Sequence, residues 1–201
     1  MSTQATIAGT VVSVPDGYDL IERMPFDDPQ STSFGREEPG AICHLVLAPV
    51  AEADAMPFGD PQPVIDDIHA NIDDDQGLIE VDAGETAKGR PYVYNIVRTN
   101  LEPGSMHYAL RLHLGAEQGV VGVQGAFDTA GSSSYRDSFV MSKLMADTDA
   151  PVEGWFADPY DPDFALGNLM NQSELSKYDA DFPDHPLTLM RRFVADLAAL
   201  N

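Results

Sequence analysis

Hydrophobic and polar residues alternate along much of the first two thirds of the chain, as is typical of β-strands. The alternation predicts seven strands, at residues 6–14, 18–24, 41–49, 78–83, 92–101, 106–114 and 119–127. The last four are separated only by short breaks that contain glycine, so we expect them to pair as consecutive antiparallel neighbours in a meander. The strand at 106–114 carries apolar residues on one face and His107, Arg111 and His113 on the other, which predicts a half-exposed strand.

A second periodicity, of three to four residues, predicts helices. Apolar residues recur at helical spacing in three segments, residues 64–74, 132–145 and 187–200. One or two further short helices are predicted within residues 164–178. Stretches rich in proline, aspartate, serine and glycine predict loops at residues 25–40, 57–63 and 152–163.

Together these elements predict an α+β fold in which helices pack on a curved antiparallel sheet. We expect residues 1–150 to form this α+β domain and residues 151–201 to form a helical C-terminal extension packed on it. Disordered tails are poor in large apolar residues, whereas this segment holds many, among them Trp155, Phe182 and Phe193. We therefore expect Trp155 and Phe182 to be mostly buried against the domain.

The charge balance narrows the choice of partners. The 201 residues include 33 Asp and Glu against 11 Lys and Arg, a formal net charge of -22. Such a field repels phosphate backbones and anionic membranes, so we expect neither nucleic acid nor membrane as a partner. It attracts cations or a basic protein. Adaptation to an acidic proteome or to high salt explains the same composition equally well.

The apolar runs, the N-terminal residues and the cysteine content indicate in which cellular compartment the protein is expected. The sequence has no run of the roughly 20 apolar residues that span a bilayer, and residues 1–18 do not have the pattern of a signal peptide. Cys43 is the only cysteine and lies in an apolar run, where it is typical of a small buried residue. A cytoplasmic protein is the expectation.

Four segments resemble a known fold group. These are residues 12–18 (VSVPDGY), residues 89–94 (GRPYVY), and the strands at 108–114 and 120–127. Their order, with the closing helix, is similar to the PsbP-like group, which includes the PsbP subunit of photosystem II and small bacterial proteins of the DcrB type. The resemblance covers about residues 6–147. It implies a binding or assembly factor, and the group has no shared catalytic residues to carry over.

Known catalytic motifs are missing from the sequence. The segment Gly131–Tyr135 approaches the Gly-x-Ser-x-Gly elbow of serine hydrolases but lacks the second glycine, so capping of the following helix is the better interpretation. No two histidines have the spacing of a helical zinc motif, and His69, in an acidic helix, is expected to be solvated. We therefore predict no catalytic residue, no metal site and no cofactor.

Two weaker features lie in the extension. Asp158, Asp161 and Asp163 supply three carboxylates in one loop, as a hard cation requires, but a solvated loop is favoured because an EF-hand glycine and glutamate are missing. Aromatic residues gather in the same loop: Trp155, Phe156, Tyr160 and Phe164. They either anchor the extension to its domain, which we favour, or form an interface.

The function that these observations favour is non-enzymatic. We expect a protein-binding factor of accessory, chaperone-like or immunity type, with a partner of basic character and an oligomeric state that the sequence does not define. The alternative is a small-molecule or metal-ion binding protein that uses a groove between the sheet and the C-terminal extension. An unrecognised hydrolase is the third candidate.

Overall fold

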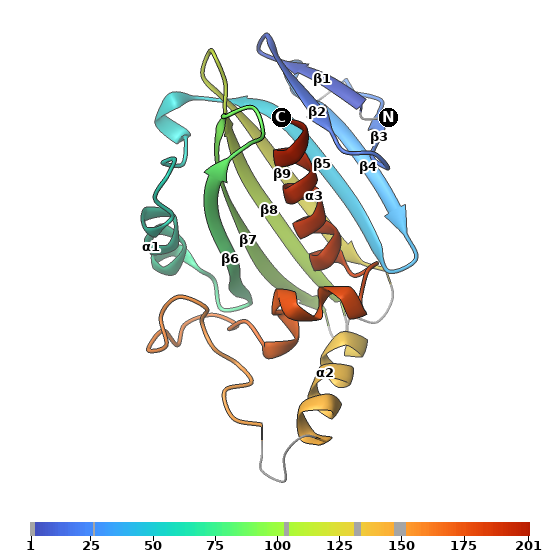
Figure 1. Ribbon diagram of the computed structural model, residues 1–201, viewed down its shortest axis with the longest axis vertical. Coiled ribbons are helices and arrows are strands. Elements are labelled where there is room, and N and C mark those ends of the chain that lie inside the picture. The colour runs from blue at the N-terminus through green and yellow to red at the C-terminus, as the bar shows by residue number, and fades with distance from the viewer. Residues whose placement is uncertain (1–2, 26, 103–104, 131–133, 147–151) are drawn as a thin grey trace.

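The computed structural model describes residues 3–25, 27–102, 105–130, 134–146 and 152–201. Its centre is a seven-stranded antiparallel sheet with the strand order β3-β4-β5-β9-β8-β7-β6, beside which lies a separate hairpin of β1 and β2 (Figure 1). Helices pack on the sheet, and the last of them is the C-terminal helix. The predicted α+β fold with an antiparallel sheet is confirmed.

The element bounds are as follows. The strands are β1 (Thr3–Ile7), β2 (Thr10–Val14), β3 (Asp19–Ile21), β4 (Thr32–Glu38), β5 (Ala41–Val50), β6 (Gln76–Glu85), β7 (Pro91–Glu102), β8 (Ser105–Gly115) and β9 (Val120–Thr129). The α-helices are α1 (Gln62–Asn71), α2 (Ser134–Ala146) and α3 (Pro186–Leu200), and the 3-10 helices are η1 (Glu52–Asp54), η2 (Gln172–Glu174) and η3 (Ser176–Asp181).

The meander predicted from β6 to β9 is confirmed, because each strand pairs antiparallel with the next. β5 then pairs with the other side of β9, which places the apolar strand 41–50 inside the sheet. Alternation along β8 directs Leu110, Leu112 and Tyr108 into the main core. His107 and Arg111 lie on the opposite face.

Two sequence predictions were wrong near the N-terminus. Residues 6–14 do not form one strand: Ala8 (φ 46°) and Gly9 (φ 82°) form a two-residue turn between β1 and β2. Positive φ at both turn positions matches the twist of a hairpin. The predicted loop 25–40 contains the strand β4. Its sequence is mostly polar, and Phe34 is its one fully buried residue.

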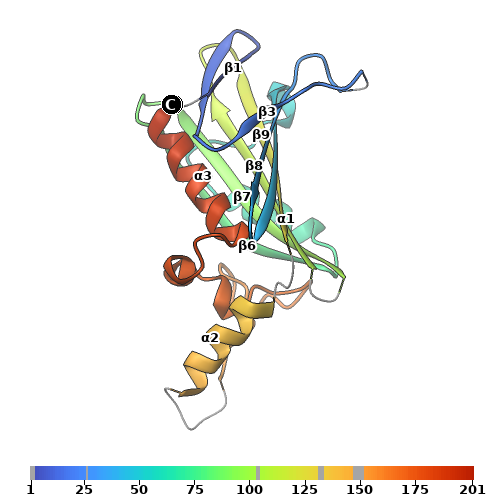
Figure 2. The same ribbon diagram turned by 90° about the vertical axis from the view of Figure 1, so that its right-hand side faces the viewer.

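Helix α3 covers one face of the sheet (Figures 1 and 2). Its apolar stripe is buried in the main core and consists of Leu187, Met190, Phe193, Val194 and Leu197. Asn201, just after the helix, exchanges hydrogen bonds with the backbone of Ser13: Ser13 N donates to Oδ1 (2.9 Å) and Nδ2 donates to Ser13 O (2.8 Å). The end of the chain is therefore fastened to β2.

The opposite face of the sheet is only partly covered. Helix α1 and Met56 pack over β6 and β7 through a second apolar cluster that includes Val64, Ile65 and Leu78. The rest of this face is open and forms two pockets, of about 620 and 530 Å³, which share His44, Val46 and Gln124.

The edge strand β6 is covered by the C-terminal segment. The Tyr160 hydroxyl accepts a hydrogen bond from Val81 N and donates one to Val81 O (2.9 Å), and Asn168 N donates to Gln76 O (2.6 Å). The close approach of Asn168 to β6 requires a glycine at position 77, because a Cβ there would lie 1.9 Å from Asn168 O. At the other edge of the sheet, β3 has only three residues.

Within the described part of the chain, no helix is long and apolar enough to cross a bilayer.

Candidate functional site

Buried charges join the C-terminal segment to the sheet. Arg98 on β7 is 1% exposed and donates through Nη1 to Glu174 Oε2 (2.6 Å), while its Nη2 donates to Asn168 O (2.8 Å). Tyr108 on β8 donates to the other oxygen of Glu174 (3.1 Å). Burial raises the pKa of Glu174, against the effect of Arg98, and raises that of Tyr108 well above its usual value. These groups are enclosed, so we assign them a structural role.

A second buried arginine holds the base of α2. Arg136 is 2% exposed and donates to Ser173 O (2.7 Å) through Nε and to Asp179 Oδ1 (2.9 Å) through Nη2. Asp179 also pairs with Arg191 (3.1 Å) on α3. The first turn of α2 is therefore tied to both η3 and α3, and the helix leaves the body of the protein from a fixed base.

Beyond this base, α2 projects away from the sheet (Figures 1 and 2). Its inner residue Val140 packs with Tyr178 and Phe182. Its outer face presents Tyr135 (68% exposed) and Phe139 (42% exposed), four residues apart and thus neighbours on the helix surface. Both rings meet Phe182 edge to face, with centroids 5.9 and 5.5 Å away. The two rings therefore form an aromatic surface that rests on Phe182 on one side and is exposed to solvent on the other.

A groove of about 350 Å³ adjoins this aromatic surface. Pro39 and Gly40 from the β4–β5 turn, Thr129 at the end of β9, and the segment from Phe182 to His185 line it together with Tyr135. Asp184 stands exposed at the rim and has no ion-pair partner within the described ranges. We call the set Tyr135, Phe139, Phe182, Pro39 and Asp184 the α2 surface. It lies between the end of the sheet and the C-terminal segment.

The aromatic residues predicted as one cluster do not form one. Trp155 is partly buried against the Val140–Tyr178–Phe182 cluster, and Phe156 (58% exposed) meets its ring edge to face at 6.4 Å. Tyr160 binds the backbone of Val81 on β6, as described above. Phe182 is buried as expected (8% exposed), whereas Trp155 is buried only in part.

Phe164 lies with His69, which corrects a prediction. The His69 ring stacks on Phe164 at a centroid distance of 4.0 Å, and its Nε2 lies 3.0 Å from Asp158 Oδ2. The expectation that His69 is solvated was wrong, because Phe164 and Asp158 of the C-terminal segment pack against its ring. The one or two short helices predicted at residues 164–178 correspond to the 3-10 helices η2 and η3, which begin later in the segment, at Gln172 and Ser176.

The three aspartates proposed as weak cation ligands are joined by hydrogen bonds within their own loop. Asp158 Oδ1 accepts hydrogen bonds from the backbone N–H groups of Tyr160 and Asp161 (both 2.9 Å), and Asp161 Oδ1 accepts from Asp163 N (2.9 Å). Asp158 is buried and the other two are exposed. In the part of the chain that the structure describes, no three His, Cys, Asp or Glu side chains gather as a metal ion requires.

Sequence reasoning did not single out Tyr135 and Phe139. A signal was available, because two aromatic residues four apart in a predicted helix share one face. The serines predicted to cap this helix fall partly outside the described residues, since Ser132 and Ser133 are not among them, while Ser134 begins α2.

Comparison with known proteins adds little beyond the fold. No family model and no curated protein matches the chain. Among solved structures, the chain is similar to the solution structure of cyanobacterial PsbP (CyanoP) from Synechocystis sp. PCC 6803, with 14% sequence identity and a TM-score of 0.36, over 73% of this chain and 88% of that one. Similarity at this level carries no inference about a site.

Proposed function

We propose that this protein is a non-enzymatic binding factor, of accessory, chaperone-like or immunity type, and that it contacts a basic partner protein through the α2 surface. The observation that carries the proposal is the exposed pair Tyr135 and Phe139 on a helix that projects from the body. Aromatic side chains dominate the energetics of protein interfaces, because they bury a large area at a low cost in conformational entropy. Two of them exposed side by side therefore favour a binding surface.

The support beneath these rings also favours binding. Phe182 is held at 5.5 Å from the Arg136 guanidinium, which is itself buried among oxygen acceptors. A surface that is already fixed before binding loses little freedom when the partner arrives. The neighbouring groove of about 350 Å³ has the size to receive one large side chain of the partner.

Charge favours a basic partner. The formal net charge of -22 steers cationic proteins toward the molecule, and the exposed Asp184 at the groove forms no ion pair among the described residues, although the buried Arg136 lines the same groove. Lysine or arginine residues flanking an apolar anchor would suit this rim. Membership of the PsbP-like group is part of the same proposal, since that resemblance implies a binding or assembly role.

The test compares affinity capture from native lysate by three forms of the protein. The forms are the wild type, the double variant Tyr135→Ala/Phe139→Ala, and the control Leu166→Ala, which removes an equally exposed apolar side chain (64% exposed) far from α2 in the sequence. We expect one or more basic proteins to be retained by the wild type and the control, and to be lost with the double variant. Retention should also weaken as salt is raised.

The double variant should fold, because both side chains are largely exposed, and a melting temperature near that of the wild type would verify this. If the double variant retains the same proteins as the wild type, the α2 surface is not the binding site. If the specifically retained proteins are acidic, the charge argument fails.

A further inference from the structure

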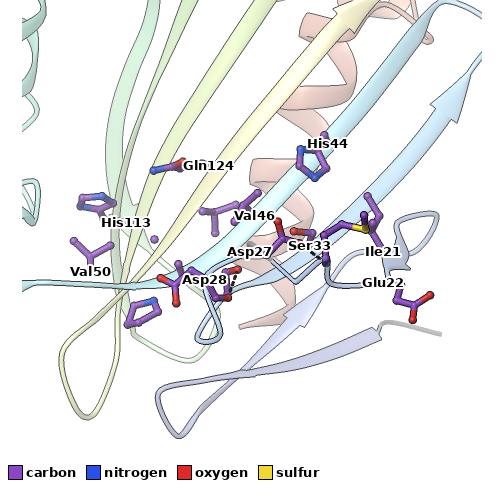
Figure 3. A pocket seen from close by; sticks show the side chains of 16 residues that line it. Ile21, Glu22, Asp27, Asp28, Ser33, His44, Val46, Val50, His113 and Gln124 are labelled. Atoms are coloured by element: carbon purple, nitrogen blue, oxygen red, sulfur yellow. Dashed lines mark hydrogen bonds between the residues drawn. The ribbon is translucent and has the colours of Figure 1, made fainter.

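We propose that the larger pocket on the uncovered face of the sheet binds a small organic amine, which carries a hydrogen-bond acceptor at its other end. This site is separate from the α2 surface and does not depend on the function proposed for it. The pocket has a volume of about 620 Å³, within the roughly 300–1,000 Å³ of sites for small ligands. β5, β8 and β9 form its floor, and the connection from β3 to β4 forms one wall (Figure 3).

The wall is acidic. Glu22, Asp27 and Asp28 line the pocket, and no lysine or arginine does. Asp27 uses one oxygen to accept a hydrogen bond from Met24 N (2.7 Å), and Asp28 uses one to accept from Gln30 N (2.8 Å). These bonds fix the two carboxylates in the loop and leave each a second oxygen. Arg23, in the same connection, is turned to Pro29 O (3.0 Å).

The floor supplies a hydrogen-bond donor that the protein itself does not use. His113 lines the pocket and is 3% exposed. Its Nδ1 accepts a hydrogen bond from Met56 N (2.9 Å), so the proton of the neutral ring lies on Nε2. Nε2 has no hydrogen-bond partner among the described residues. Burial lowers the pKa of His113 from 6.5 to about 4, so the ring is neutral near pH 7.

The floor is also open at this point because it contains a glycine. A Cβ at Gly122 would lie 2.5 Å from Val50 Cγ2 and 3.8 Å from His113 Cδ2, the atom next to Nε2. A larger residue would therefore fill the space in front of the imidazole. Figure 3 shows His113 and Val50 at one end of the pocket and Ile21 and Glu22 at the other.

These features define the ligand. Its cationic group suits the carboxylates of Glu22, Asp27 and Asp28, which stand in a field that is already negative. An aliphatic stem suits Ile21, Met24, Val46 and Val50, which supply the apolar part of the lining. A carbonyl or hydroxyl oxygen at the other end would accept from His113 Nε2 and from the neighbouring Gln124 amide.

The test is calorimetric titration of the full chain with 6-aminohexanamide, in which five methylene groups join an ammonium group to a primary amide. We expect saturable binding with one site per chain. Hexanamide, which lacks the cation, and hexylamine, which lacks the acceptor, should each bind at least about tenfold more weakly, since each loses one charged or hydrogen-bonded contact. If hexanamide binds as tightly as 6-aminohexanamide, the acidic wall does not bind the cation. If hexylamine binds as tightly, His113 does not donate to the ligand.

Two matched double variants distinguish binding by the pocket carboxylates from a general effect of the negative net charge on affinity. Asp27→Asn/Asp28→Asn keeps an oxygen acceptor for each loop hydrogen bond and should weaken 6-aminohexanamide at least about tenfold. Asp73→Asn/Asp74→Asn removes the same two charges from exposed positions after α1 and should leave the affinity within about twofold. Equal weakening by both pairs, or the absence of saturable binding to the wild type, would overturn the proposal.

Discussion

Arg98 and Arg136 keep their charges inside the protein because each guanidinium donates to several oxygen acceptors. Arg98 alone donates to the Glu174 carboxylate, to the Asn168 side chain and to two backbone carbonyls. Removing one partner of such a buried pair leaves the other charge without compensation, which costs far more than the net value of the pair.

We therefore expect Arg98→Met to lower the free energy of unfolding by about 3–5 kcal/mol. Urea denaturation at pH 7 measures the change. Lys143→Met is the control, because Lys143 lies 3.8 Å from Asp181 at the surface and is 54% exposed, and we expect it to change stability by about 1 kcal/mol or less. Similar effects of the two substitutions would show that Glu174 finds other partners.

His185 should make stability depend on pH. Burial, with Arg136 and Arg191 nearby, lowers its pKa from 6.5 to about 3. The folded protein therefore keeps this ring neutral, while the unfolded chain takes up a proton below pH 6.5. The stabilising contribution is complete above pH 6.5 and is lost as the pH falls toward 3.

The variant His185→Asn removes this titration and retains a side chain that can cap α3, as His185 does through Leu187 N (3.2 Å). Between pH 7 and pH 5 the free energy of unfolding should fall by about 2 kcal/mol less in the variant than in the wild type. Urea titrations at the two pH values give both differences. Equal pH dependence would mean that His185 is protonated in the folded state.

At the scale of elements, α3 carries most of the attachment of the C-terminal segment. Its five stripe residues are buried against the sheet, and each large apolar side chain contributes about 1.5–3 kcal/mol on burial. A chain that ends at Asp149 should therefore expose this face of the sheet and aggregate, without a cooperative thermal transition. Calorimetry and light scattering test the division into residues 1–150 and 151–201. A cooperative transition at the temperature of the full chain would show that residues 1–150 fold independently.

The elements that the sequence alone predicted well are strand-length or helix-length runs with a clear pattern. β8 alternates apolar and polar residues from Leu110 to Leu114, β7 and β9 are runs rich in β-branched residues, and α3 has a regular apolar stripe. β4 was missed because Phe34 is its only buried residue, and the β1–β2 turn was missed because Ala8-Gly9 lacks the usual Asn-Gly or Asp-Gly signal.

The candidate site was less predictable than the fold. The pairing of Tyr135 and Phe139 is visible in the sequence, but their exposure follows from the projection of α2, which depends on the buried Arg136. The acceptors of Arg136 at Ser173 and Asp179 lie 37 and 43 residues away, and no local pattern predicts such contacts.

At the scale of the whole molecule, the net charge of -22 should weaken the folded state at low ionic strength. Like charges repel more strongly in the compact protein than in the expanded chain, and salt screens this repulsion. We expect the melting temperature to rise between about 0.01 and 0.3 M NaCl, over which the Debye length falls from about 30 Å to below 8 Å. Scanning calorimetry across this series measures it. A flat or falling series would show that the acidic residues are already compensated.

The covered edge at β6 has a consequence for self-assembly. Growth of a fibril by strand addition requires two available edges on every subunit, one to receive and one to donate. Here Tyr160 and Asn168 occupy the backbone of β6, and the close contact at Gly77 leaves no room for a foreign strand. Within the seven-stranded sheet the opposite edge, at β3 and the end of β4, is left, so edge-to-edge pairing of this sheet between copies would stop at two.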